Sequence, residues 1–106
     1  MSALHALLDL PETAALSLTA VRLDDWGRTL ILHGSASAVE GGRAFTLRFD
    51  DCRDMRWRTY VAFEGGDSSA TSIVDFALGR DQHRSPAQIL ASAFGLTLYY
   101  GSLTVL

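Results

Sequence analysis

The chain contains no lysine and no asparagine, and it has a single cysteine and two prolines among 106 residues. One cysteine cannot form a disulfide within the chain, which excludes the small disulfide-stapled frameworks of secreted proteins. All nine basic side chains are arginines, a bias that we attribute to a GC-rich bacterial genome and not to function. These absences favour a reducing environment, and we predict a cytoplasmic protein.

Long apolar runs are also missing. The N-terminal segment has no basic region, and Asp9 interrupts its apolar residues, so we expect no signal peptide. No stretch approaches the roughly 20 apolar residues that span a bilayer, and no membrane association is predicted. The formal net charge of −3 gives no strong field that would attract phosphate backbones, so nucleic acid is not a favoured partner.

The motifs of common enzyme classes are absent as well. There is no phosphate-binding loop, dinucleotide fingerprint, Cys-x-x-Cys pair, His-Glu-x-x-His or nucleophile elbow. The histidines at 5, 33 and 83 are too dispersed to indicate a zinc site. We therefore predict no catalytic residues, no metal and no cofactor, and the interpretation as an enzyme is disfavoured.

Two weak nucleophile hypotheses remain. Cys52 lies between Asp51 and Arg53, and an arginine lowers a thiol pKa while the neighbouring carboxylates raise it. The segment Asp81-Gln-His83 with Ser85 contains the residue types of a catalytic triad. A triad depends on fixed geometry, which a polar loop seldom provides, so neither site is favoured.

The amino-acid composition indicates one globular domain over residues 1–106. Hydrophobic residues make up 48% and charged residues 20%, which is ordinary for a folded chain. From about residue 16 the apolar residues recur with a period of two, as in antiparallel strands. We predict a mainly β fold, a small antiparallel sandwich or partly closed barrel, built on a four-strand meander plus a C-terminal hairpin, with one or two short peripheral helices.

Hairpin partners must place their apolar side chains on the same face of the sheet, and this rule sets the expected register. It predicts strands over 17–23, 30–40, 43–50 and 53–62. The first hairpin turns at residues 25–28 and the second at Gly41-Gly42, which would pair Glu40 with Arg43 and oppose Gly34 with Phe49. A three-residue loop over 50–52 would then place Arg48 opposite Asp54, and Trp57 would be hidden in the core.

The flanking segments are predicted from their turn residues. Ser2 is expected to cap a short helix that ends before Pro11, and residues 64–69 form a polar loop. Residues 74–78 alternate as a fifth strand. Residues 86–94 are predicted as a helix after Ser85-Pro86, with a strand over 88–92 left open. Gly101-Ser102 is the expected turn of the C-terminal hairpin.

The outward face of the predicted meander supplies most of the candidate binding residues, which are His33, Arg48, Asp50, Arg56, Arg58 and Tyr60. In the predicted register His33 lies opposite Asp50, a pairing that would raise the pKa of the imidazole. One interpretation is a solvated face with weak ion pairs. The other is a docking face where Arg56 and Arg58 contact carboxylate or phosphate groups.

Trp26 is the remaining candidate, at the tip of the first predicted hairpin. An exposed tryptophan at a tip is a common interface anchor, because it brings a large area and one N–H donor. Alternatively the ring folds back over the edge of the sheet.

The leading functional hypothesis is a non-enzymatic protein-interaction module that associates with itself or with a protein partner. Small size and acidity suggest an immunity or inhibitor type, by analogy of class alone. One alternative is a small-ligand carrier or enzyme with a cleft near His33, Asp50 and Arg48. A second alternative is nucleic-acid binding through the face that carries Arg48, Arg53, Arg56 and Arg58. The sequence names neither the ligand nor the oligomeric state.

Overall fold

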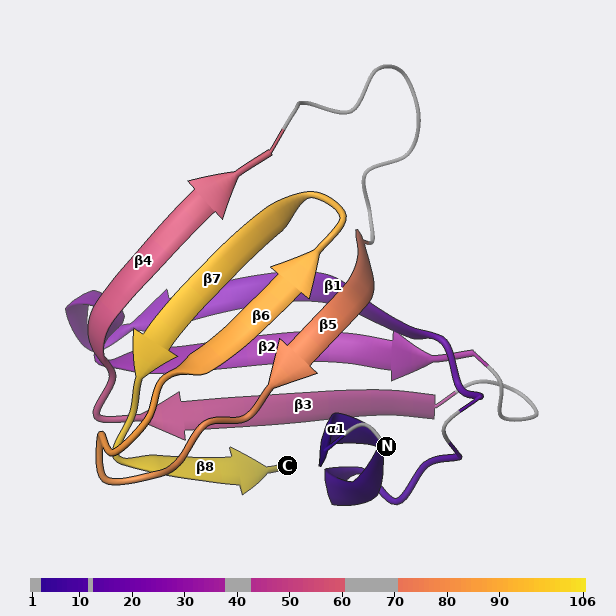
Figure 1. Cartoon of the computed structure of the whole chain (residues 1–106), viewed down its shortest axis with the longest axis horizontal. Coiled ribbons are helices and arrows are strands. Elements are labelled where there is room, and N and C mark those ends of the chain that lie inside the picture. The colour runs from indigo at the N-terminus through magenta and orange to yellow at the C-terminus, as the bar shows by residue number, and fades with distance from the viewer. Residues whose placement is uncertain (1–2, 12, 38–42, 61–70) are drawn as a thin grey trace.

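A computed structural model describes residues 3–11, 13–37, 43–60 and 71–106 and shows a mainly β protein (Figure 1). Its strands are β1 (Leu16–Asp24), β2 (Thr29–Ala36), β3 (Arg43–Asp50), β4 (Arg53–Thr59), β5 (Thr71–Ala77), β6 (Ala87–Ala91), β7 (Phe94–Tyr99) and β8 (Ser102–Val105). They form one antiparallel sheet in the order β4-β7-β6-β5-β1-β2-β3-β8, which is not closed into a barrel. The predicted fold class is confirmed.

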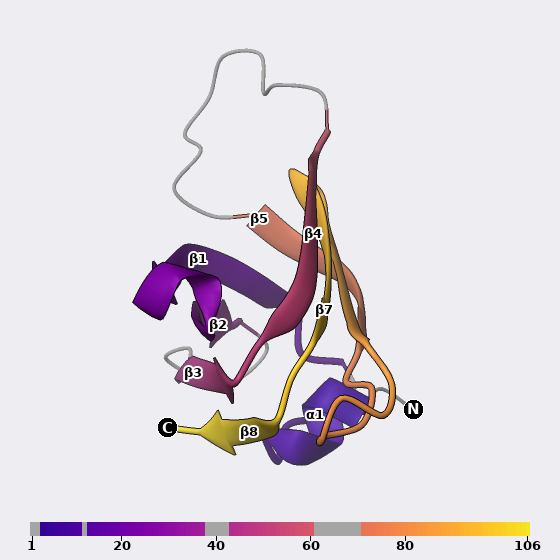
Figure 2. The same ribbon diagram turned by 90° about the vertical axis from the view of Figure 1, so that its left-hand side faces the viewer.

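The sheet is folded over on itself into two layers. The first layer holds β1, β2, β3 and β8, and the second layer holds β4, β7, β6 and β5 (Figures 1 and 2). The fold line lies between β1 and β5, where only Ser17 with Ser72 and Leu18 with Thr71 are paired. The short helix α1 (Ala3–Leu7) contacts β5, and Leu4 and Leu8 are buried, whereas Leu7 is exposed.

The core lies between the two layers. The first layer contributes the alternating side chains of β2 and β3, with Leu30, Leu32, Leu47 and Phe49 almost completely buried. The second layer contributes those of β6 and β7, of which the largest are Ile89, Leu96 and Leu98. The assignment of β2 and β3 residues to inward and outward faces, which came from parity alone, is confirmed.

The first hairpin has the predicted register, with Leu23 opposite Leu30 and Asp24 opposite Thr29. Its turn is the short 3-10 segment η1 (Asp25–Gly27). Upstream, the pairing slips by one residue between Leu18 and Ala20. Such a bulge changes the parity of the residues that face inward along the strand. Leu18 before the bulge and Val21 after it therefore point to the same side of the sheet.

The predicted register of the second hairpin is wrong by four residues. Gly34 lies opposite Phe45, not Phe49, and Arg43 lies opposite Ala36, not Glu40. The physical reason is a close approach: a Cβ on Gly34 would come within 2.4 Å of the Phe45 ring, so the glycine makes room for that ring. A shift of four is even, which is why the faces were still correct. Residues 38–42, including the Gly41-Gly42 turn, lie outside the described residues.

The predicted meander and the predicted C-terminal hairpin are both wrong in their pairing. After β3 the chain crosses to the second layer, where β4 pairs with β7, and the second neighbour of β3 is β8. Arg48 therefore faces Thr104, not Asp54. The crossing is made at Asp51 and Asp54, whose φ angles of 54° differ from the extended backbone of a simple hairpin. β7 and β8 belong to different layers, joined through Gly101.

Of the remaining predictions, the fifth strand is confirmed and the helix over 86–94 is wrong. The segment 86–94 is not a helix but β6 and the start of β7, so the strand alternative was correct. The fifth strand is confirmed as β5, with Phe76 buried and Val74 exposed. The 64–69 loop, and residues 61–62 of the predicted fourth strand, lie outside the described residues. Within the described part of the chain, no helix has the length and apolarity to cross a bilayer.

Candidate functional site

The predicted outward face is divided by the fold into two separate surfaces. His33, Arg48 and Asp50 lie on β2 and β3, whereas Arg56 and Arg58 lie on β4 in the other layer. Because the inward faces of the two layers meet in the core, their outward faces point in opposite directions. The four arginines proposed for nucleic acid are likewise divided, with Arg48 on the first layer.

On the first of these surfaces, the contacts between the candidate residues and their neighbours are local. His33 Nδ1 lies 3.3 Å from Thr46 Oγ1, because Thr46 is its partner in the observed register. The predicted opposition of His33 and Asp50 is therefore wrong. The Arg48 Nε group donates a hydrogen bond of 3.0 Å to Asp50 Oδ2 two residues away. The two depressions described below, one beside Trp26 and one over the outward face of the second layer, are not lined by His33, Arg48 or Asp50.

Trp26 is fully exposed at the tip of the first hairpin, so the interpretation in which its ring folds back is wrong. Its φ of 61° and the 52° of Asp25 lie in the left-handed region, which disfavours side chains with a Cβ. Each such residue costs on the order of 1 kcal/mol or more, and strain of this kind is concentrated at functional sites. The turn thus holds a large apolar ring in water on a strained backbone.

A depression of about 360 Å³ lies beside this tip, between the first hairpin and β4. We call its apolar lining the Trp26 patch, which consists of Leu23, Trp26, Met55 and Trp57. Leu23 and Trp57 are half-exposed, although both were predicted to face the core. The Trp57 ring stacks on Phe94, with centroids 4.2 Å apart and the planes 7° from parallel, and its outer part remains in water.

Charges of both signs border the Trp26 patch. Arg28 and Asp54 line the same depression, and neither has an ion pair with any residue that the structure describes. Arg53 also lines it, but its guanidinium lies 3.5 Å from Asp51 Oδ2. The patch is therefore an apolar surface with one available cation and one available anion at its rim.

Cys52 lies at the floor of this depression but is not an activated nucleophile. The pKa of the thiol is raised from 9.0 to about 11, chiefly by burial and also by the Asp50 and Asp51 carboxylates, while a backbone hydrogen bond from Leu30 lowers it. Its Sγ donates to the carbonyl oxygen of Phe49 at 3.3 Å. The thiol is neutral near pH 7, so thiolate chemistry is disfavoured.

The thiol pKa predicts slow alkylation. At pH 8 we expect Cys52 in the folded protein to react with iodoacetamide about a hundredfold more slowly than in the urea-unfolded chain, because the thiolate fraction falls tenfold per pKa unit. The same shift means that Cys52 favours folding below its ordinary pKa of 9.0 and loses this contribution as the pH rises toward 11. Mass spectrometry of timed, quenched samples measures the rate, and equal rates in both states would contradict the burial.

The triad-like residues do not form a relay. His83 Nε2 contacts the carbonyl oxygen of Asp51 at 2.8 Å, and Asp81 Oδ1 accepts a hydrogen bond of 2.7 Å from Arg84. Ser85 takes part in the turn through its carbonyl oxygen, which accepts from Arg80 N–H. Over residues 3–11, 13–37, 43–60 and 71–106, no three His, Cys, Asp or Glu side chains gather as metal ligands would.

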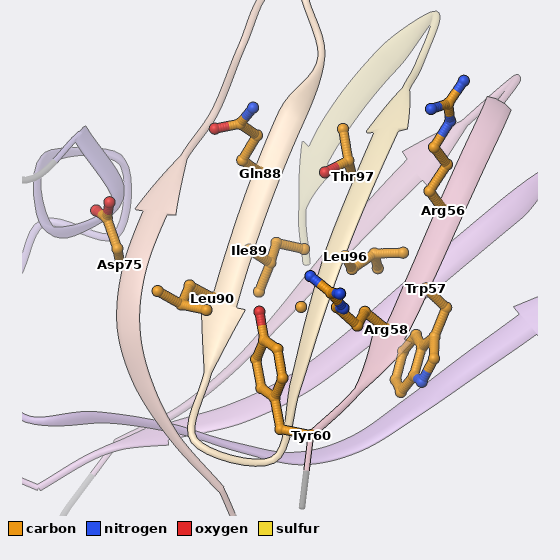
Figure 3. Close-up of a pocket in the computed structure, with 11 residues that line it drawn as sticks. Arg56, Trp57, Arg58, Tyr60, Asp75, Gln88, Ile89, Leu90, Leu96 and Thr97 are labelled. Carbon is orange, nitrogen blue, oxygen red and sulfur yellow. The ribbon is translucent and has the colours of Figure 1, made fainter.

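A second depression, of about 390 Å³, runs over the outward face of the second layer (Figure 3). We call it the arginine groove, and its polar lining includes Arg56, Arg58, Tyr60, Gln88 and Thr97. Figure 3 shows Arg58 extending from β4 across β7, on the same face of the sheet as Tyr60. The Tyr60 hydroxyl lies over Gly95, where a Cβ would come within 2.7 Å of it.

Sequence reasoning found some of these residues and missed others. Trp26, Arg56, Arg58 and Tyr60 were predicted, and the last three do share one surface. Leu23, Met55, Gln88 and Thr97 were missed as surface residues. The signal of Leu23 and Met55 was weak, because an apolar residue at a strand end has the same alternation whether it is covered or open to water. Gln88 was missed because it lies in the segment 86–94 that was predicted as a helix.

No known protein family matches the chain, and a search of curated proteins finds none that is significantly similar.

Proposed function

We propose that the protein is a non-enzymatic protein-interaction module that pairs with a second copy of itself through the Trp26 patch. The observation that carries the proposal is the fully exposed Trp26 ring on a strained left-handed turn beside half-exposed Leu23 and Trp57. Large aromatic side chains surrounded by apolar contacts are the usual energetic centres of protein interfaces. A cytoplasmic location belongs to the same proposal, with Cys52 reduced and buried in support.

The charges at the rim of the patch favour a second copy as the occupant. A two-fold interface brings the same surface of both partners together, so each charge at its rim meets the rim of the other copy. Arg28 and Asp54 supply opposite charges with no partner among the described residues, and they can pair across such an axis. A patch with only one sign of charge would instead repel its own copy.

The test is the oligomeric state of the wild-type protein and of Trp26→Gly, measured by size-exclusion chromatography with light scattering. We expect a wild-type dimer whose dissociation constant rises at least about thirtyfold in Trp26→Gly, as for an interface residue worth roughly 2 kcal/mol. The same variant should gain about 1 kcal/mol of monomer stability, because glycine relieves the left-handed strain. If Trp26 acted only in folding, its substitution would not weaken dimerisation while stabilising the monomer.

Gln82→Gly is the matched control for this test. Gln82 is exposed, has a φ of 56°, and lies outside the Trp26 patch. It should show the gain in stability with no change in dimerisation. A wild-type protein that stays strictly monomeric at high concentration, or a dimer that Trp26→Gly leaves intact, would overturn the proposal.

A further inference from the structure

We propose that the free edge of β4 is an acceptor for an extended segment of another protein that alternates acidic and apolar residues. The outer edge of β4 ends the sheet, and no described strand pairs with it. Its backbone N–H and C=O groups on that side are therefore open to an added strand, a mode of peptide recognition in which the main chain supplies affinity. The added strand would contact Trp57, which also belongs to the Trp26 patch, but the proposal rests on the open edge of β4 with Arg56 and Arg58 and does not depend on self-pairing.

The alternation of side chains along β4 defines what an added strand must carry. Arg56 and Arg58 point outward over the arginine groove, because they are paired with Thr97 and Gly95 on the outward face of β7. Trp57 lies between them, on the inward face, opposite buried Leu96. Residues of paired strands lie directly opposite each other with side chains on the same face. A partner strand thus meets arginine, tryptophan and arginine in turn.

The charge of this edge favours acidic side chains. Neither Arg56 nor Arg58 has an ion pair with any residue that the structure describes, whereas Arg22, Arg48, Arg53 and Arg84 each do. Guanidinium groups bind carboxylates through charge-assisted, often bidentate hydrogen bonds. The residue opposite Trp57 should be apolar, because the half-exposed indole offers it a ring already stacked on Phe94. The expected pattern is acidic, apolar, acidic, which is the same in either chain direction.

The same arginines argue against a second copy at this edge. Two β4 strands paired about Arg56 would place Arg56 against its own copy, and pairing about Trp57 would place Arg56 against Arg58. Like charges directly opposite each other are destabilising. Pairing about Met55 would run through the irregularity between Arg53 and Arg56. The charges that block self-pairing therefore select a strand of opposite charge.

The probe is a fluorescein-labelled nine-residue peptide of alternating glutamate and valine, titrated with the full chain and followed by fluorescence anisotropy. We expect saturable binding by the wild-type protein and by Trp26→Gly alike. The double variant Arg56→Glu/Arg58→Glu should bind at least about tenfold more weakly, and should instead bind the peptide in which lysine replaces glutamate. Arg80→Glu is the matched control, since Arg80 is exposed, lacks an ion pair among the described residues and lies outside the groove.

Two further peptides separate strand addition from general attraction to negative charge. A peptide of alternating glutamate and serine keeps the charge but loses the apolar contact with Trp57. A parent peptide that is N-methylated at alternate amides keeps the side chains but loses the backbone N–H donors along one of its edges. Both should bind at least about tenfold more weakly than the parent peptide. Equal binding of either peptide, unchanged binding by the double variant, or no binding up to about 1 mM would overturn the proposal.

Discussion

Phe49→Ala is expected to lower the free energy of unfolding by about 3 to 5 kcal/mol. The side chain is completely buried on β3, between Leu30 on β2 and Leu103 on β8. Its ring meets that of Tyr100 edge-on, with centroids 5.0 Å apart and planes at 77°. Alanine removes this contact and leaves a cavity between two layers that the backbone hydrogen bonds hold in place. The loss is a large share of the 5 to 15 kcal/mol or so that stabilises a typical domain.

Urea denaturation followed by tryptophan fluorescence measures the change. Phe49→Leu is the matched variant, because it keeps an apolar side chain at the same position and should cost clearly less than alanine. A loss below about 1 kcal/mol for Phe49→Ala would contradict a central position for this ring.

Gly34→Val is expected to cost about 3 kcal/mol or more and to hinder folding of the chain. A Cβ at this position would lie 2.4 Å from the Phe45 ring and 2.5 Å from the carbonyl oxygen of Ser17. The ring can turn away, but the carbonyl belongs to the backbone of β1 next to the bulge and cannot move without disturbing the pairing. Valine also adds two methyl groups to the overlap.

Ser35→Val is the control for this prediction. Ser35 is the next residue of β2 and is only half-buried, on the opposite face of the sheet. Valine suits a strand, so we expect a change within about 0.5 kcal/mol there. The yield of soluble protein and the urea midpoint of both variants give the comparison. Equal stability of the two would show that Gly34 and Phe45 are not in contact.

The sequence predicted faces well and partners poorly, for a reason that lies in the period of a strand. Alternation tells which residues point inward, and Leu30, Leu32, Leu47 and Phe49 do so. Shifting a register by any even number leaves the faces unchanged, so the true opposition of Gly34 and Phe45 could not be distinguished from the predicted one. Choosing it needed the volume of a ring lying over a glycine, which is a property of three dimensions.

The crossing of β4 to the second layer escaped prediction for a related reason. Both layers face one core, so an inward residue has the same pattern whether its strand stays in the first layer or joins the second. Trp57 therefore looked like a core residue, and the structure leaves half of it exposed beside the end of the sandwich. Trp26 was named as a candidate because it lies at the tip of a turn, but the sequence left open whether its ring folds back over the sheet, and only the structure shows that it is fully exposed.

The pairing of β3 with β8 has a consequence for the order of folding. Phe49 and Leu103 are neighbours in the first layer, yet the whole of the second layer lies between them in the chain. Joining two distant segments of a flexible chain carries an entropic penalty that grows with the length of the intervening loop. If the intervening strands assemble first, they draw the two ends together and shorten the effective search. In that order of folding, β8 adds last to a sheet that has already formed. Its backbone amides would then be among the first to exchange with solvent deuterium.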